Sequence, residues 1–184
     1  MVRVACIGSL LALLALGLVG MLPGGTVPRA TALEATPATE CPVTTDAEQE
    51  AIARRWFEEV LNGADLAVLD EMLSPEFTYH SGALGQMSAG ELADAVLGPI
   101  LVGFPDVDYT ITQAFTGDDV VTLIWSAQGT HTGSFQGYAP SGTSATWTGI
   151  NVYRFECGRV AEAWAEVDAL GRLRQMGEVG TPTP

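Results

Sequence analysis

The chain has 184 residues, of which 22 are acidic and 8 are basic, so its formal net charge at pH 7 is -14. This length fits one domain with a tail. Such an acidic chain repels phosphate backbones and anionic lipid headgroups, so we expect no nucleic-acid partner and no binding to an anionic bilayer. A hydrophobic content of 47% with 16% charged residues excludes a chain that is disordered throughout.

The N-terminus has the pattern of a secretory signal peptide over residues 1–32. Arg3 precedes an apolar run at residues 4–22, and small residues around Ala32 offer a cleavage site. We therefore expect a secreted or extracytoplasmic protein, cleaved near Ala32, with no stable membrane association after cleavage. Because the apolar run approaches the length that spans a bilayer, the alternative is an uncleaved N-terminal membrane anchor.

Cysteine usage agrees with export. Cys6 leaves with the signal peptide, so Cys41 and Cys157 remain. In an oxidising compartment, two cysteines favour one disulfide, and the alternative is two unrelated buried thiols. The two histidines, His80 and His131, lie far apart, and the sequence has neither a C-x-x-C nor an H-E-x-x-H motif, so we expect no metal site.

Helix signals dominate the first half of the domain, after a linker at residues 33–43 that is rich in Ala, Thr and Pro. A T-x-x-E capping box at residues 45–48 opens a first helix that ends at Asn62-Gly63. Asp65 can cap a short second helix, which Ser74-Pro75 breaks.

A third helix follows a short strand expected at residues 77–80 and a glycine-containing loop at 81–87. The S-x-x-E capping box at residues 88–91 opens this helix, which runs to about Phe104, with a kink expected at Pro99.

The second half has strand patterns at residues 107–116, 120–132, 145–156 and 159–167, with turns at 117–119 and 157–158. Asp168 can cap a short last helix, and residues 178–184 form a tail. The order predicts an α+β domain over residues 44–177, in which three N-terminal helices pack on one face of a curved antiparallel sheet. Such a sheet leaves a cone-shaped cavity beside the helices, where a ligand would bind.

Four segments resemble the SnoaL-like polyketide (ester) cyclase family, whose members have the cone-shaped nuclear transport factor 2-like fold. They are residues 53–65 (ARRWFEEVLNGAD), 129–137 (GTHTGSFQG), 147–155 (WTGINVYRF) and 168–177 (DALGRLRQMG). The resemblance implies an intramolecular, aldol-type ring closure of a polyketide ester that needs no cofactor. In that reaction a carboxylate removes the proton α to a carbonyl, and the pocket stabilises the enolate.

The family's catalytic aspartate position falls on Ala165, and a pocket histidine of the characterised cyclase falls on Asn151. The remaining catalytic candidates are His131, Glu166 and Asp168. In a regular strand Glu166 points to the face opposite Ala165, unless a bulge re-aims it. The alternatives are a solvated Glu166, an Asp168 that only caps a helix, and a hydrogen-bonded structural His131.

Six residues are candidates for the ligand pocket, because aromatic and polar groups on inward faces line such cavities. They are Trp56, Tyr79, His80, Trp125, Asn151 and Trp164. The alternative is that the tryptophans are core residues and that His80 is structural.

The sequence thus predicts a secreted SnoaL-like protein whose apolar cavity takes a small, hydrophobic, oxygenated molecule, with cofactor-independent acid/base chemistry on a carbonyl or ester. Two alternatives stay open: a binding protein that kept the cavity and lost the acid, favoured by Ala165, and a purely structural dimer module. A homodimer through the open face of the sheet is expected.

Overall fold

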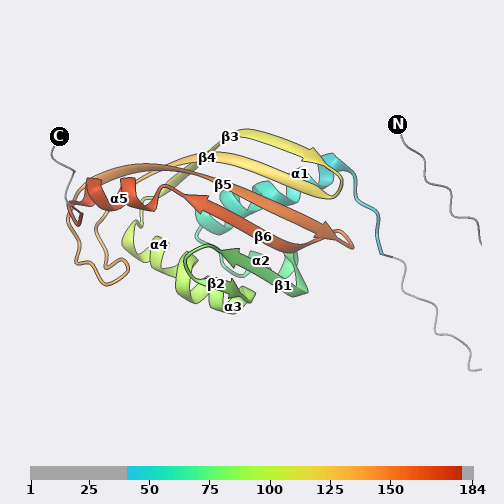
Figure 1. Ribbon diagram of the computed structural model, residues 1–184, viewed down its shortest axis with the longest axis horizontal. Coiled ribbons are helices and arrows are strands. Elements are labelled where there is room, and N and C mark those ends of the chain that lie inside the picture. Colours follow the sequence, from blue (N-terminus) through green and yellow to red (C-terminus); the bar gives the residue numbers. More distant parts are fainter. Residues whose placement is uncertain (1–40, 180–184) are drawn as a thin grey trace, which may run out of the picture. The chain divides into compact units, whose positions relative to one another are not determined.

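The computed structural model describes residues 41–179 (Figure 1). The predicted signal peptide, most of the predicted linker and the last five residues of the tail lie outside this range. Within it, no helix is both long enough and apolar enough to cross a membrane.

The first helical segment consists of α1 (Asp46–Arg55) and its π-helical continuation η1 (Trp56–Leu61). The predicted capping box is present: the Glu48 N–H donates to Thr45 Oγ1 at 3.3 Å, and the Thr45 N–H donates to the Glu48 carboxylate at 2.8 Å. Asn62 is the C-terminal cap, as predicted. The segment buries Trp56 and Phe57, which face the sheet side of the core.

Two further helical segments complete the helical layer. The short helix α2 (Val68–Met72) ends at the residue directly before the first strand, β1. The other segment joins α3 (Ala89–Leu92), η2 (Ala93–Leu97) and α4 (Gly98–Gly103), and begins at the predicted capping box. Pro99 lies in the first turn of α4, directly after the π-helical η2, so its missing N–H falls where the hydrogen-bond pattern of the segment changes from π to α.

Six strands form one sheet in the order β2-β1-β6-β5-β4-β3. Their bounds are β1 (Leu73–Ser81), β2 (Gly85–Met87), β3 (Asp108–Gly117), β4 (Val120–Thr130), β5 (Ser144–Glu156) and β6 (Arg159–Val167).

The sheet differs from the prediction in three ways. The first strand starts at Leu73 rather than residue 77, and the expected loop at 81–87 contains β2, which closes a hairpin with β1. The sheet is not wholly antiparallel, since β1 pairs with β6 in parallel, with Tyr79 opposite Ala163. This pairing is non-local, so local sequence patterns carry no signal for it.

Tight turns and bulges bend the antiparallel part of the sheet. Asp118 and Asp119 have φ angles of 53° and 60°, and Cys157 and Gly158 have 51° and 74°, as two-residue hairpin turns require. The register shifts after Ile111 in the β3–β4 pair and after Arg154 in the β5–β6 pair. Such bulges increase the local bend and twist of a strand.

The hydrophobic core lies between the helices and one face of the sheet. Alternate residues of β4 are buried, including Val121, Leu123 and Trp125, as the period of two predicts. Figure 1 shows α1 to α4 along one side of the curved sheet, which does not close into a barrel. The predicted α+β fold with a curved sheet is confirmed.

The last helix, α5 (Ala169–Met176), is attached to β5. Asp168 caps it by accepting from the Gly171 N–H at 2.8 Å, as predicted. Gln175 pairs with the backbone of Thr146: its amide donates to the Thr146 carbonyl at 2.7 Å and accepts from the Thr146 N–H at 2.9 Å. These contacts hold α5 in place against the sheet.

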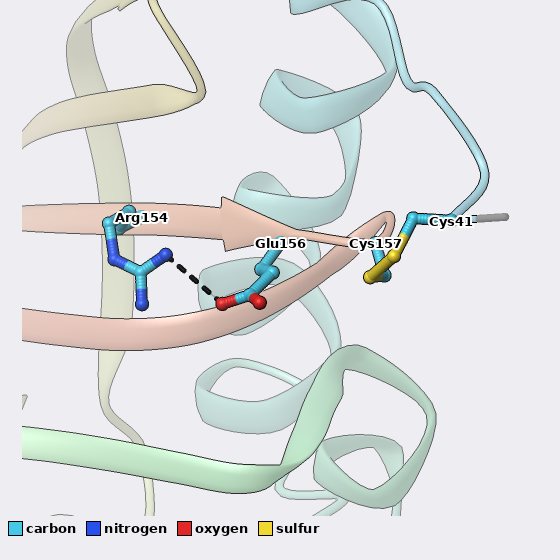
Figure 2. Close-up of a disulfide and its surroundings, with 4 residues drawn as sticks. All are labelled: Cys41, Arg154, Glu156 and Cys157. Atoms are coloured by element: carbon cyan, nitrogen blue, oxygen red, sulfur yellow. Dashed lines mark hydrogen bonds and ion pairs between the residues drawn. A yellow bond between two sulfur atoms is a disulfide. The ribbon is translucent and has the colours of Figure 1, made fainter. Parts of the chain in front are cut away.

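Cys41 and Cys157 form a disulfide between the segment before α1 and the β5–β6 turn (Figure 2). Their Cα atoms are 4.5 Å apart and 116 residues apart in sequence. Beside the bond, the guanidinium of Arg154 lies 3.3 Å from the Glu156 carboxylate. The predicted pairing is thus present, and it is consistent with an extracytoplasmic location.

Reduction of this disulfide should destabilise the protein. In the chain-entropy model a cross-link over a loop this long contributes about 4–5 kcal/mol, which is an upper value for what is observed. We expect dithiothreitol to lower the melting temperature of the wild type, measured by circular dichroism. The double variant Cys41→Ser/Cys157→Ser should melt at the lower temperature with or without reductant. A wild-type melting temperature that reductant leaves unchanged would contradict the prediction.

Candidate functional site

A cavity of about 400 Å³ lies between the helical segments and the sheet. Helices η1, α3, η2, α4 and α5, every strand except β2, and two loops contribute to its walls. The lining side chains are mostly aromatic or aliphatic: Trp56, Phe57, Leu61, Tyr79, Leu84, Leu92, Val96, Leu97, Ile100, Tyr109, Trp125, Phe135 and Trp147. Its volume suits a small ligand of drug-like or metabolite size.

Aromatic rings in mutual contact make one wall of the cavity. The Trp125 ring lies 5.8 Å from that of Phe57 and 5.1 Å from that of Tyr109, and the Tyr109 ring lies 6.2 Å from that of Trp147. The contacts are tilted or edge-to-face, as aromatic quadrupoles prefer. The wall is therefore apolar and closely packed.

Asn151 is the centre of a buried hydrogen-bond chain behind this wall. The Trp125 Nε1–H donates to Asn151 Oδ1 at 2.8 Å, and Asn151 Nδ2 donates to Tyr153 Oη at 3.1 Å. Asn151 is 4% exposed and Tyr153 is fully buried. Since an unpaired indole N–H is costly in a core, Asn151 fixes the orientation of the Trp125 ring.

Two tyrosines, Tyr79 and Tyr109, are among the residues that line the cavity. Burial raises the pKa of Tyr79 to about 12, with a smaller contribution from the negative charge of Glu166. Burial likewise raises the pKa of Tyr109 to about 12, although the positive charge of Arg172 acts in the opposite direction. At neutral pH both phenols are protonated, so they can donate hydrogen bonds to a ligand oxygen.

Glu166 is the sole carboxylate among the described residues that line the cavity. Its side chain is exposed and lies beside Gly82. If Gly82 were replaced by alanine, the added β-carbon would stand 3.5 Å from Glu166 Oε1. Gly82 also lines the cavity, so the carboxylate lies at the mouth, beside the β1–β2 turn. Ala165, the neighbour of Glu166 in β6, also lines the cavity but brings no titratable group to it.

Arg172, which no sequence pattern singled out as a site residue, lines the cavity from α5. Its side chain is only 7% exposed, and its guanidinium carbon lies 4.6 Å from the centre of the Phe135 ring and 5.0 Å from that of Trp147. One signal could have found it: Arg172 lies four residues before the apolar Met176, so both share the buried face of α5.

Two predicted catalytic candidates lie apart from the cavity lining. His131 is fully buried; its Nδ1 accepts from the Ser141 N–H at 3.2 Å, and its ring lies 5.3 Å from that of Phe104. Asp168 caps α5. Both side chains are thus engaged in local structure.

His80 and Trp164, predicted as pocket residues, lie on the opposite face of the sheet. Their rings stack at 4.6 Å, and His80 Nε2 lies 2.9 Å from the Glu162 carboxylate. The reason is the period of two along a strand: Tyr79 and Ala165, the neighbours of His80 and Trp164, are the residues that line the cavity. The predicted homodimer through this outer face, where Trp164 is 37% exposed, stays a prediction.

Trp56, Tyr79, Trp125, Asn151 and Glu166 are the predicted site residues that the fold brings together around the cavity. Within residues 41–179, no cluster of three or more His, Cys, Asp or Glu side chains could hold a metal ion.

Replacement of Asn151 should destabilise the fold. The variant Asn151→Leu leaves the Trp125 N–H and the Tyr153 hydroxyl buried without their partner, so we expect a loss of about 2 kcal/mol or more in the free energy of unfolding. Thr148→Ala, an exposed change on the same strand, should stay within about 0.5 kcal/mol of wild type. Urea denaturation followed by tryptophan fluorescence measures both, and equal stabilities would contradict the role given to Asn151.

The raised phenol pKa values predict a loss of stability at high pH. Because the folded state favours the neutral phenols, this stabilisation is fully present below the ordinary tyrosine pKa of about 10 and is lost as the pH rises through the folded value. In an absorbance titration at 295 nm, Tyr79→Phe and Tyr109→Phe should each remove amplitude near pH 12. If either variant removed absorbance amplitude only near pH 10, the ordinary tyrosine pKa, the raised pKa of that tyrosine would be refuted.

Comparison with known proteins agrees with this architecture. The chain matches the family model of the SnoaL-like polyketide cyclases over residues 51–176. No curated protein sequence matches it significantly.

Solved structures give the same fold. AclR from Streptomyces galilaeus has a TM-score of 0.69 at 24% identity, and the match covers 76% of this chain and 91% of the AclR chain. IdmH from Streptomyces antibioticus has a TM-score of 0.62 at 26% identity, covering 70% and 98%. A protein from Catenulispora acidiphila with a ketosteroid isomerase-like fold has a TM-score of 0.57 at 20% identity, covering 71% and 97%. Because the family model matches well over half of the chain, the chain belongs to the SnoaL-like polyketide cyclase family.

Proposed function

We propose that this protein is an extracytoplasmic, cofactor-independent enzyme that binds a small, largely apolar carbonyl or ester compound in the cavity and removes a proton α to the carbonyl. The observation that carries the proposal is the position of Glu166, a carboxylate at the mouth of an otherwise apolar cavity. Family membership supports the reaction class, and the disulfide supports the location.

The proposed step needs a base and a stabiliser of the developing charge. The Glu166 carboxylate takes the proton from the α carbon, and the C–H electron pair moves into the C–C bond as the carbonyl oxygen becomes an enolate oxygen. A bound ligand would displace water from the carboxylate, and carboxylates are stronger bases in drier surroundings. The neutral phenol of Tyr79 is a suitable donor for the enolate oxygen, because it lies in the same cavity and within electrostatic reach of Glu166.

Binding without turnover is a second candidate function. The specific observation in its favour is Ala165, whose methyl group lines the cavity where the family's aspartate would lie. The two candidates differ in a measurable step, the exchange of an α proton.

We expect the protein to accelerate exchange of the methyl-ketone protons of 2-acetylnaphthalene in D2O, followed by proton NMR. A positioned general base contributes about 100-fold or more, so Glu166→Gln should abolish most of the acceleration while binding, measured by calorimetry, is retained. Glu58→Gln, an exposed change on η1, is the matched control and should leave exchange unchanged. Ala165→Asp, which restores a carboxylate in the cavity, should raise the exchange rate.

Each failure has its own meaning. Binding of 2-acetylnaphthalene without any exchange supports the second candidate. Exchange that Glu166→Gln leaves intact refutes the role of Glu166, and absence of both binding and exchange refutes the proposed function itself.

A further inference from the structure

Arg172 is a buried positive charge for which the described part of the chain provides no counter-charge in contact. Its side chain is 7% exposed, and no carboxylate of residues 41–179 lies within 4.0 Å of its guanidinium. Its buried Nε–H has no hydrogen-bond acceptor in this part of the chain. Asp168, the N-cap of α5, acts on it only through longer-range attraction.

Aromatic rings supply part of the compensation. The guanidinium carbon lies 4.6 Å from the centre of the Phe135 ring and 5.0 Å from that of Trp147, both within the range of cation–π attraction. The N–H donors of a guanidinium lie in its plane. Stacking of the guanidinium on the faces of these two rings therefore offsets part of the cost of burying its charge. Its in-plane N–H donors remain available to another group.

A second unused donor lines the same cavity. The Trp147 Nε1–H is buried and makes no hydrogen bond to residues 41–179. The contact of this indole with the Tyr109 hydroxyl offsets part of the rise that burial causes in the pKa of that phenol, but it does not reach full hydrogen-bond geometry. Since Arg172 packs against the Trp147 ring, two buried donors, one of them charged, lie side by side and lack an acceptor.

The missing group is therefore an acceptor, and the charge makes an anion the best one. A buried donor without a partner costs free energy, and a buried unpaired charge costs more. Burial lowers the pKa of Arg172, but an arginine stays protonated at neutral pH. A carboxylate fits a guanidinium edge with two oxygens and can accept from a neighbouring N–H as well.

We propose that the ligand of this cavity is a monocarboxylate on an apolar ring body, with its carboxylate bound by Arg172 and the Trp147 N–H and its rings against the aromatic wall. The inference rests on the proposed function, since it names the class of compound that enters the same cavity. Arg172 then binds the substrate, and Glu166 acts on a different part of it.

Two probes of similar shape test this proposal. 2-Naphthoate carries the carboxylate, and 2-acetylnaphthalene carries a neutral carbonyl on the same ring system. We expect the protein to bind 2-naphthoate at least ten-fold more tightly by isothermal titration calorimetry at neutral pH. Hydrogen bonds to charged groups predict that Arg172→Gln weakens 2-naphthoate binding by about 30-fold, with little effect on 2-acetylnaphthalene.

Matched variants separate recognition from folding and from net charge. Arg174→Gln removes one positive charge from the same helix at a residue outside the cavity lining, and it should leave both affinities unchanged. Arg172→Lys keeps the charge but loses the planar donor edge, so its affinity for 2-naphthoate should lie between those of wild type and Arg172→Gln. Trp147→Phe keeps one aromatic ring but removes the N–H and the five-membered ring that carries it. The effect of the lost ring is given by 2-acetylnaphthalene, and 2-naphthoate binding should weaken by several-fold more than that. Melting temperatures show that each variant is folded.

Three results would overturn the inference. If both probes bind equally well and Arg172→Gln changes neither affinity, the carboxylate site fails while the proposed function stands. If Arg172→Gln slows proton exchange in 2-acetylnaphthalene but leaves 2-naphthoate binding unchanged, Arg172 acts on the enolate and not on a ligand carboxylate. If neither probe binds, the inference and the proposed function fail together.

Discussion

The alternation of side chains along β4, β5 and β6 decides which groups reach the cavity. Trp125, Trp147 and Asn151 share the inner face, and their outer neighbours meet solvent. The same rule places Ala165 inside and stacks Trp164 on His80 outside. Glu166, next to Ala165 near the end of β6, follows the outer face and reaches the cavity only at its mouth. A shift of one residue in the β5–β6 register would exchange the two faces, so the whole chemistry of the site depends on this pairing.

The bends of the sheet turn that inner face into a cavity. Bulges after Ile111 and Arg154 lie in the long antiparallel pairs, and α5 is held to the end of β5 by Gln175. That helix brings Arg172 over Phe135 and Trp147. An acidic chain with a net charge of -14 thus keeps one arginine inside an aromatic cavity, away from its many surface carboxylates.

The cavity combines groups with opposite roles at different places. Glu166 is exposed at the mouth, Arg172 is buried, and the phenols of Tyr79 and Tyr109 stay neutral because burial disfavours their ionised forms. A base, a cation and neutral donors around one apolar space can bind and polarise an oxygenated molecule without a cofactor. Ala165 brings no titratable group to the cavity, and the proposed chemistry therefore rests on Glu166.

Local sequence patterns were sufficient to predict the capping boxes at Thr45 and Ser88, the hairpin turns, the buried face of β4 and the family. These depend on nearest neighbours and on strand or helix periods, which a sequence shows directly. Three features became visible only in the folded chain: β1 pairs in parallel with β6, His80 and Trp164 lie on the outer face of the sheet, and Arg172 is buried in the cavity. Those outcomes depend on contacts between residues far apart in the chain, where burial and partners override the local preference of a charged or aromatic side chain.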